Sequence, residues 1–485
     1  MQVSMDGPSV NLKFLDELIK DPVFNNESDS IITIGVCGLH VIHGSFQTGH
    51  KAVNWNVNST LRGMYRLFKD SPARRADYTK MTGSTVFPLK FCSTRWVENR
   101  NVAERALDTF KHVEKFVKAS KLPGTVSAQN VKAAISDDMT LPRIAFFHSV
   151  AALVEPFLKQ FQSGAPMVPF LYEEIEKLMR NVMQRFIKSS ALSEANTVKK
   201  LMTLDLVENS VSYKAVDMGV KAKSLLTKST ASDRMKMQFR MECITYLRAM
   251  TEKIRERSPL NYKFTRLAAC LSPWKIVRDR ETTLRRFGEM VELLHLAGKI
   301  KSTVADKAKS EFQTFVVEAN GEKKEIFKNF SMANDRLDDF YSGLLDDNYS
   351  SLFDVVKLVL IMSRGQAQVE SGFSVNGDIL VENLIEESVV AQRLVYSAIL
   401  SAGGVLKINY EDKSLLSAAR SAHANYLIAL DERKNKQSEE EKRSAEKRIA
   451  AIKVKELKAK RIRLAEEAAK DQQELEKEIE RLSRY

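Results

Sequence analysis

The feature that most constrains the fold is a helical apolar repeat through the middle of the chain, from about Val102 to Val359. Apolar residues recur there every three or four positions, which places them on one face of a helix. One stripe consists of Leu171, Ile175, Leu178, Met179, Val182, Met183, Phe186 and Ile187. A second contains Met235, Phe239, Met241, Ile244, Leu247 and Ile254. Methionine and aromatic side chains on such stripes are far more often core packing than a cofactor site. We therefore predict a large all-helical region.

The first 40 residues have a different pattern, in which short extended segments flank a helix. Gln2–Met5 and Ser30–Val36 are predicted strands, because the second is rich in β-branched residues and is bounded by Ser, Asp and Gly. Between them, Asn11–Lys20 has helical apolar spacing, and Pro22 ends that helix. The expected fold class is therefore mainly α with a small α/β part.

The C-terminal segment changes composition sharply. From Glu432 to Tyr485 there are 17 Lys and Arg against 13 Asp and Glu, with no Pro and no Gly. This composition is typical of a long solvated helix with many ion pairs between residues four apart. Apolar residues keep a three/four spacing only near the end, at Leu475, Ile479 and Leu482, so a strict heptad is not sustained. A long charged helix is predicted, and its pairing as a coiled coil stays open.

Composition narrows the class of protein. The 485 residues suffice for two to four domains, and 44% hydrophobic with 28% charged residues is ordinary for a soluble globular protein. The longest apolar run, Val355–Met362, is interrupted by Lys357 and is shorter than the ~18 residues that span a bilayer. The N-terminus has no basic start and no apolar core, so no secretion signal is expected. Four scattered cysteines do not form a disulfide framework, which favours a reducing compartment, the cytosol or the nucleus.

Charge points toward one kind of partner. The net charge of +13 and the pI near 9.3 favour a polyanion such as DNA or RNA. Many soluble nuclear and cytosolic proteins are equally basic, however, so charge needs a second argument.

That second argument comes from four short motifs in a particular order. They are DGPSVN at Asp6–Asn11, CGLHVIH at Cys37–His43, CSTRW at Cys92–Trp96 and, far downstream, VESGFS at Val369–Ser374. Each motif is weak alone, and their order with the long gap before the last is more specific. The series resembles the hAT (hobo–Activator) superfamily of transposases, over roughly residues 1 to 430.

The resemblance implies an RNase H-like core interrupted by a large helical insertion. Four parts are then expected: a partial core over 1–96, the insertion over 97–350, a returning core helix with the hAT dimerisation region over 351–430, and a charged helical tail over 431–485. It also implies that Asp6 and Glu370 match two catalytic positions. Such carboxylates hold Mg²⁺, a hard cation that prefers oxygen ligands.

A departure from the family matters as much as the match. The family's catalytic set includes an earlier Asp on a preceding strand, whereas the matched second Asp is already at position 6. We therefore expect the first Asp to lie outside this chain. No cofactor is then required, and Mg²⁺ is expected only if residual nuclease activity remains. Asp6 has an alternative reading as an ordinary Asp-Gly-Pro turn residue, and Glu370 as a helix-surface residue.

The resemblance places His40 near the DNA end, and the types of the neighbouring residues suit DNA. Arg95 can pair with a phosphate, and the Trp96 indole can stack on an unpaired base. Trp96 has an alternative role as a core anchor at the base of the insertion. Basic residues nearby make an electropositive surface plausible, namely Arg74, Arg75, Lys90, Arg100 and Arg105.

Cys37, His40 and His43 also raise the possibility of zinc. A structural zinc site needs four ligands, usually as two pairs, and only one pair is present. Cys37 is therefore better explained as a buried thiol at the end of the second predicted strand.

An apolar stretch near the C-terminus resembles the hAT dimerisation region. We expect self-association through Leu380, Leu384, Val389 and Leu394. Packing within the domain core is the alternative.

Taken together, the sequence predicts a transposon-derived nuclear protein that associates with DNA, forms a homodimer and is catalytically incomplete. Neither a membrane nor a small-molecule substrate is expected as a partner, and the cytoplasm is the second possible location. Two alternatives stay open: an active transposase or nuclease when part of a longer chain, and a helical interaction scaffold that does not bind DNA.

Overall fold

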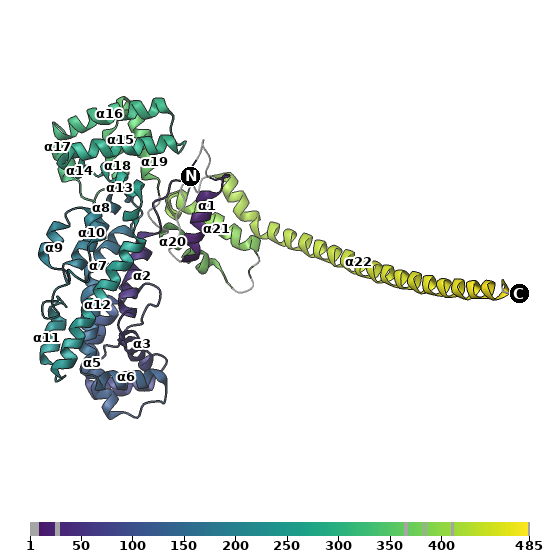
Figure 1. Ribbon diagram of the computed structural model, residues 1–485, viewed down its shortest axis with the longest axis horizontal. Helices are drawn as coiled ribbons and strands as arrows, with labels where there is room; N and C mark the ends of the chain where they lie inside the picture. The colour runs from purple at the N-terminus through teal and green to yellow at the C-terminus, as the bar shows by residue number, and fades with distance from the viewer. Residues whose placement is uncertain are drawn as a thin grey trace. The chain divides into compact units, whose positions relative to one another are not determined.

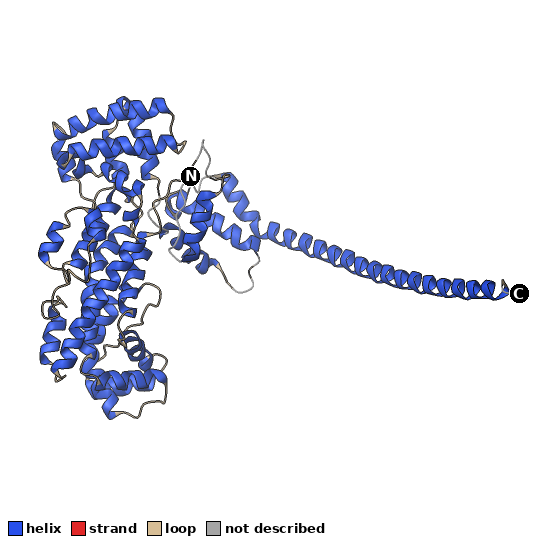
Figure 2. Ribbon diagram, in the orientation of Figure 1, coloured by secondary structure: helices blue, strands red, loops and turns tan. Residues whose placement is uncertain are grey.

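The computed structural model describes residues 9–24, 30–362, 367–381, 384, 386–408 and 412–483 (Figure 1). Of residues 9 and 367–371 it describes the backbone alone. The chain divides into two compact units, Met1–Ser374 and Val375–Tyr485. Helices make up 76% of the chain, and the described residues contain no β-sheet (Figure 2). The prediction of a mainly helical fold is confirmed.

Most of the α-helices belong to the first unit. They are α1 (Ser9–Lys20), α2 (Gly38–Lys51), α3 (Val57–Phe68), α4 (Pro72–Thr82), α5 (Arg100–Ala119), α6 (Val126–Ser136), α7 (Thr140–Phe161), α8 (Val168–Met183), α9 (Ser189–Glu194), α10 (Val198–Thr203), α11 (Val220–Lys228), α12 (Asp233–Arg257), α13 (Lys263–Ala268), α14 (Pro273–Arg278), α15 (Arg280–Leu296), α16 (Ser302–Asn320), α17 (Lys324–Asn329), α18 (Leu337–Leu344) and α19 (Ser350–Leu360). Short 3₁₀ turns are η1 (Trp96–Asn99), η2 (Pro259–Asn261), η3 (Ala269–Leu271) and η4 (Asp347–Tyr349).

The centre of the first unit is built on α2 and α12, which lie side by side (Figure 1). Gly49 permits this close approach, because a Cβ there would lie 2.8 Å from both the ring and the carbonyl oxygen of Tyr246. The Tyr246 hydroxyl donates a hydrogen bond to the Phe46 carbonyl at 3.2 Å. Both side chains are fully buried. A side chain at position 49 would therefore force the two helices apart.

Aromatic rings join this pair to α7. The Phe46 and Phe147 rings meet edge to face with centroids 4.9 Å apart, and Trp55 meets Phe146 in the same way at 5.5 Å. Edge-to-face contacts of this kind add about 0.5–1.5 kcal/mol each beyond the burial of their apolar area. The first predicted apolar stripe is buried throughout, and Phe239, Leu247 and Ile254 of the second are buried as well. Met235 and Met241 of the second stripe are 43% and 46% exposed, so the prediction of core packing is wrong for these two methionines.

Among the described residues, α7 is long and apolar enough to cross a membrane by length and composition. The segment contains no uninterrupted apolar run of that length, because Arg143, Glu155 and Lys159 lie within it. In the fold, 56% of its most apolar window is buried inside the protein. Its Glu155 carboxylate forms an ion pair with Arg100 of α5. This pattern is that of a core helix.

Within the described residues, the strand predicted at Ser30–Val36 does not belong to a sheet. The segment is extended, but only Ile32 within it has β-bridge pairing. A strand needs a neighbouring strand for its backbone hydrogen bonds. In the described part of the chain the Ser30 amide donates instead to the carbonyl of Ala297, at the end of α15. Ile32 and Ile34 are buried in the helical core, so their burial was predicted correctly and their pairing was not.

Other N-terminal predictions have mixed outcomes. The helix predicted over Asn11–Lys20 is confirmed as α1. The first predicted strand, Gln2–Met5, lies outside the described residues. The predicted domain boundaries at 96, 350 and 430 divide the chain more finely than its two units do, and they stay predictions.

The second unit consists of the end of α20 (Ala367–Ile379), α21 (Glu386–Ser401), the 3₁₀ turn η5 (Val405–Lys407) and α22 (Lys413–Leu482). The 70-residue α22 confirms the predicted long charged helix, although it begins earlier than Glu432. Asp412 caps it by accepting hydrogen bonds from the amides of Ser414 and Leu415. No described residue of α21 or α22 is buried.

Candidate functional site

The two positions matched to catalytic acids cannot be compared in space. Asp6 lies outside the described residues, and Glu370 lies on α20 in the part whose side chains are not described. The expected closeness of the two carboxylates therefore stays a prediction. Among the side chains that are described, no three His, Cys, Asp or Glu residues gather as a metal-binding group.

The other predicted site residues do come together. His40 and His43 lie on the first turns of α2, and the Cys92–Trp96 loop runs beside them. The Val97 amide donates a hydrogen bond to Nδ1 of His43 at 3.4 Å. Burial, together with the nearby positive charges of His40 and Arg95, lowers the pKa of His43 to about 4. His43 is therefore neutral near pH 7 and serves as a buried hydrogen-bond acceptor.

Asn99 is fully buried under the Cys92–Trp96 loop and was not predicted from the sequence as a site residue. Its Oδ1 accepts a hydrogen bond from the Cys92 amide at 2.7 Å. Its Nδ2 donates to the carbonyls of Cys92 and Trp96 at 2.8 and 3.0 Å. One side chain thus satisfies three backbone groups and sets the curvature of the loop.

Cys92 lies inside this curve. Its Sγ accepts a hydrogen bond from the Arg95 amide at 3.4 Å and is 3.6 Å from the Thr94 hydroxyl. Partial burial alone would raise the pKa of the thiol, but the hydrogen bonds from Arg95 and Thr94 outweigh it and lower that pKa. The sulfur therefore helps to order the turn that presents Arg95.

Arg95 is the exposed cation of this loop. Its side chain is 48% exposed, and Nη1 lies 3.3 Å from the Glu98 carboxylate. Exposed ion pairs of this kind contribute little, about 0–1 kcal/mol, so Glu98 holds the guanidinium only weakly. Ser93 and Thr94 beside it are also exposed. A guanidinium with two neighbouring hydroxyls is a suitable set of donors for a phosphate group.

Trp96 requires a correction. The base-stacking role expected for its indole is wrong for this structure, because the side chain is only 5% exposed. Nε1 donates to the Ser93 carbonyl at 3.1 Å, and the ring packs against His50 and Phe91 with centroids 5.1 and 5.3 Å apart. Trp96 is instead the core anchor of the loop, which was the alternative interpretation.

Most of the other basic residues near this loop are engaged within the protein. Arg100 pairs with Glu155, Arg105 donates to the Phe87 carbonyl at 3.2 Å, and Arg75 donates to the Phe68 carbonyl at 2.8 Å. Of the five basic residues from which an electropositive surface was expected, three therefore make contacts within the protein. Lys90 is exposed and Arg74 is partly exposed.

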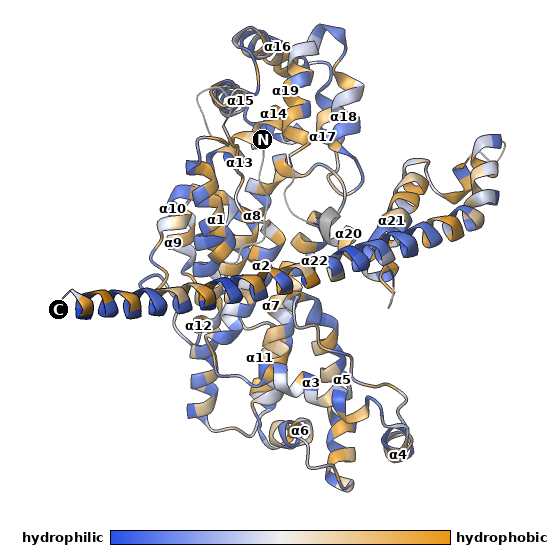
Figure 3. Cartoon of the chain, turned by 90° about the vertical axis from the view of Figure 1, so that its right-hand side faces the viewer, coloured by the Kyte–Doolittle hydropathy of each residue, from blue (hydrophilic) through white to orange (hydrophobic). Residues whose placement is uncertain are grey.

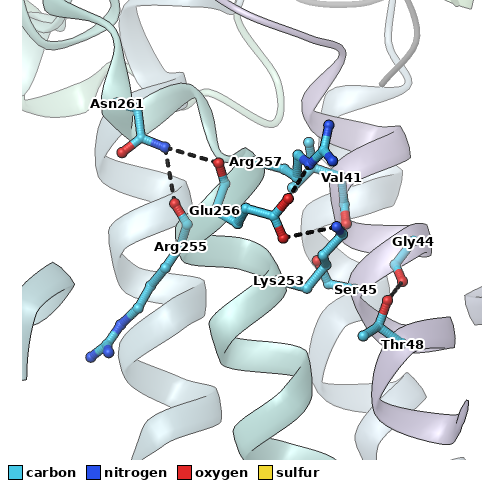
Figure 4. Close-up of polar contacts among 9 residues, drawn as sticks. All are labelled: Val41, Gly44, Ser45, Thr48, Lys253, Arg255, Glu256, Arg257 and Asn261. Carbon is cyan, nitrogen blue, oxygen red and sulfur yellow. Dashed lines mark hydrogen bonds and ion pairs between the residues drawn. The ribbon is translucent and has the colours of Figure 1, made fainter. Parts of the chain in front are cut away.

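A second polar cluster, also missed by the sequence analysis, lies at the end of α12 beside α2 (Figure 4). Glu256 pairs with Lys253 at 2.8 Å and with Arg257 at 2.7 Å, and the hydrogen bond from Lys253 lowers the pKa of its carboxyl. Asn261 Nδ2 donates to the Arg255 carbonyl at 2.9 Å and so caps the helix. The charges of Lys253, Glu256 and Arg257 are paired with one another, which indicates a structural role, although Arg257 Nη1 is buried without a hydrogen-bond partner among the described residues.

Next to this cluster is a cleft with a volume of about 460 Å³. Its lining includes Lys13 and Asp16 of α1, Glu256 and Arg257 of α12, and Tyr262. Charges of both signs line it, so the lining does not favour an anion over a cation.

The four predicted dimerisation residues are all accessible in the second unit. Leu380 and Leu394 are 59% and 66% exposed, and Leu384 and Val389 are partly exposed. Further apolar side chains of the same unit are exposed, namely Val381, Val390, Val395, Leu400 and Leu406. Burial within the domain core, the alternative, does not hold for Leu380 and Leu394, and self-association stays a prediction.

Comparisons with known protein families, curated proteins and solved structures find no match to this chain.

Proposed function

We propose that this chain is a transposon-derived protein of the hAT type that associates with DNA and dimerises through its C-terminal region. The proposal includes an RNase H-like core interrupted by a helical insertion, with an incomplete catalytic set. It also includes a nuclear location, where DNA is the available polyanion and thiols stay reduced. None of the four cysteines forms a disulfide, which agrees with such a compartment.

The observation that carries the proposal is the meeting of two of the four motifs. CGLHVIH lies at the start of α2 and CSTRW forms the loop beside it, and the Val97–His43 hydrogen bond joins them. Residues far apart in sequence are thereby gathered around Arg95, whose guanidinium faces solvent. Because the resemblance places His40 near the DNA end, an exposed cation close to the start of α2 supports a contact to DNA there.

The chemistry of this surface suits the backbone of DNA better than its bases. Arg95, Ser93 and Thr94 offer a charge and hydroxyl donors, while the buried Trp96 offers no aromatic face. Contacts to phosphates position a protein on DNA without reading the sequence. We therefore propose binding that depends on charge and has little sequence preference.

For the relic active site, Asp6 and Glu370 are the residues that would hold Mg²⁺ through carboxylate oxygens. The earlier Asp of the family's catalytic set has no match among these residues, and two carboxylates alone hold such a metal weakly. The proposed function therefore includes no strand cleavage and no required cofactor. Purified protein should leave labelled DNA intact with Mg²⁺ or Mn²⁺. Metal-dependent cleavage that Glu370→Gln abolishes would show that the site is active.

The direct test of DNA association is a salt titration with a fluorescent duplex of mixed sequence. Each phosphate that the protein neutralises releases counterions, so log affinity falls with log salt concentration, and each such contact steepens this fall by about 0.9. We expect a slope corresponding to several phosphates, and similar affinities for unrelated sequences. An affinity that does not change between about 50 and about 200 mM salt, or no binding at low salt, would favour the interaction scaffold.

A further inference from the structure

The outer half of α22 has its charges in two blocks. Residues 442–463 contain ten Lys and Arg and two Glu, whereas residues 464–482 contain seven Asp and Glu and three Lys and Arg. Every one of these side chains is exposed in the structure. The helix is therefore strongly basic along one stretch and acidic along the next.

Within these blocks some neighbouring charges repel one another, while others, such as Glu456 with Lys460 and Glu466 with Lys470, attract. Lys458 and Arg461, and Lys460 and Arg463, are like charges three residues apart, and Glu474 and Glu478 are like charges four apart. Like charges at these spacings repel on a helix surface, whereas alternating signs would attract. An oppositely charged partner would remove this repulsion.

A seam of regular spacing runs along the same stretch. Alternating steps of four and three residues connect Ala450, Val454, Leu457, Arg461, Leu464, Ala468, Asp471 and Leu475. A second consecutive step of four then leads to Ile479, and a step of three leads to Leu482. Its large apolar members are exposed, including Leu457 at 59%, Leu464 at 55% and Leu475 at 62%. Figure 3 shows apolar residues recurring along α22. This is the spacing of a coiled-coil seam, with charges at two core positions.

We propose that the outer half of α22 pairs in antiparallel orientation with α22 of a second copy of this chain, with Arg461 opposite the partner's Asp471. In antiparallel helices the numbers of facing residues have a constant sum. Placing 461 opposite 471 therefore also places Leu457 opposite the partner's Leu475, and Leu464 opposite the partner's Ala468. The two charged residues that interrupt the seam thus become each other's partners, and symmetry makes this pair twice.

The charge blocks select this orientation. The antiparallel register sets residues 450–463, with six basic and one acidic side chain, against residues 469–482 of the partner, with five acidic and three basic ones. A parallel pair would place Arg461 against the partner's Arg461 and the basic block against its own copy. Opposite charges flanking a seam set partner choice and orientation in coiled coils. Glu467, on the flank of the seam one residue from the two-fold axis, lies near the partner's Glu467, which is a local cost at an exposed position.

The test of orientation uses the full chain with one added cysteine at a time. Leu457→Cys and Leu475→Cys should each fail to form a disulfide-linked dimer alone, and an oxidised mixture of the two should form one. The parental protein, with its four native cysteines, is the control. Self-linking of either single variant would overturn the antiparallel orientation, and no link in the mixture would overturn the pairing.

The test of register exchanges the two seam charges. Arg461→Asp and Asp471→Arg should each reduce cross-linking of the mixture at least tenfold, because each places like charges together twice. The double variant Arg461→Asp/Asp471→Arg should restore it. Arg463→Asp, which makes the same charge change beside the seam, should have little effect. A double variant that cross-links no better than the singles would overturn the register.

This pairing is separate from the proposed contact around Leu394 and from DNA binding. Cross-linking is measured without DNA, so its failure leaves the proposed function standing. Loss of DNA binding in turn leaves the cross-linking pattern unchanged.

Discussion

At the scale of single residues, Asn99 determines the shape of the Cys92–Trp96 loop. We predict that Asn99→Ala lowers the free energy of unfolding by about 2–4 kcal/mol, because it leaves a backbone amide and two carbonyls without their buried partner. Urea denaturation followed by circular dichroism measures this change. Asn261→Ala is the matched control, because that asparagine also bonds backbone carbonyls but is exposed, so water can replace it. Equal losses in the two variants would contradict the role given to Asn99.

The buried histidines give the stability of the first unit a pH dependence. Burial lowers the pKa of His43 and of His50 to about 4, against 6.5 for the unfolded chain. Between about pH 4 and pH 6.5 these two histidines bind more protons in the unfolded chain than in the folded protein. Stability is therefore fully present above about pH 6.5 and falls as the pH drops toward 4. Each histidine contributes a loss of about 2 kcal/mol between pH 7 and pH 5.

A substitution isolates one of these titrations. His50→Phe keeps a ring against Trp96 and Phe147 but cannot take up a proton. We expect the stability difference between pH 7 and pH 5 to shrink by about 2 kcal/mol in this variant. His112→Gln, at an exposed position of α5, is the control and should leave the difference unchanged. An unchanged pH dependence in His50→Phe would show that other groups cause it.

At the scale of elements, α21 carries the proposed dimer contact. Leu394→Glu should shift the protein toward monomer at micromolar concentration, because a carboxylate in an apolar interface must lose its hydration. Gln392→Glu adds the same charge at a polar exposed position of the same helix and should leave the dimer intact. Sedimentation velocity distinguishes the two. A parental protein that is monomeric at these concentrations would remove the proposed dimer.

The helices show which parts of the fold the sequence could predict. The first apolar stripe lies on α8 except for Phe186 and Ile187, which follow the end of the helix, and the second lies on α12. The three/four spacing that marks a helix face is a local property, so the sequence could predict both helices. The segment Ser30–Val36 has equally local signs of a strand, yet a sheet requires a partner strand, and the described residues contain none. Local pattern predicted that Ile32 and Ile34 are buried, but it could not predict what covers them.

The site was less accessible to sequence reasoning than the helices. The CGLHVIH and CSTRW motifs were correctly singled out, and the fold brings His43 and Val97 into contact. Whether Trp96 faces solvent or core depends on packing by His50 and Phe91, which no local pattern encodes. Asn99 was missed because an asparagine just before a helix is a common capping residue, and its bonds to Cys92 and Trp96 appear only in three dimensions.

At the scale of the whole molecule, the two units differ in how their apolar side chains are used. The first unit buries an extensive helical core, whereas α21 and α22 bury none of their described residues. The second unit thus offers apolar and charged surface to partners, while the first holds the Cys92–Trp96 loop in a fixed shape. We propose that the first unit binds DNA and that the second unit self-associates.

The most direct test of the DNA assignment compares Arg95→Ala with Arg285→Ala over a salt series. Both arginines are exposed and pair with a nearby Glu on the protein surface, but Arg285 lies on α15, outside the proposed site. We predict that Arg95→Ala weakens binding to duplex DNA at every salt concentration and reduces the salt slope by about one, as expected for a lost phosphate contact. Arg285→Ala should retain parental affinity and slope. Equal losses in both variants, or parental behaviour of Arg95→Ala, would contradict the proposed site.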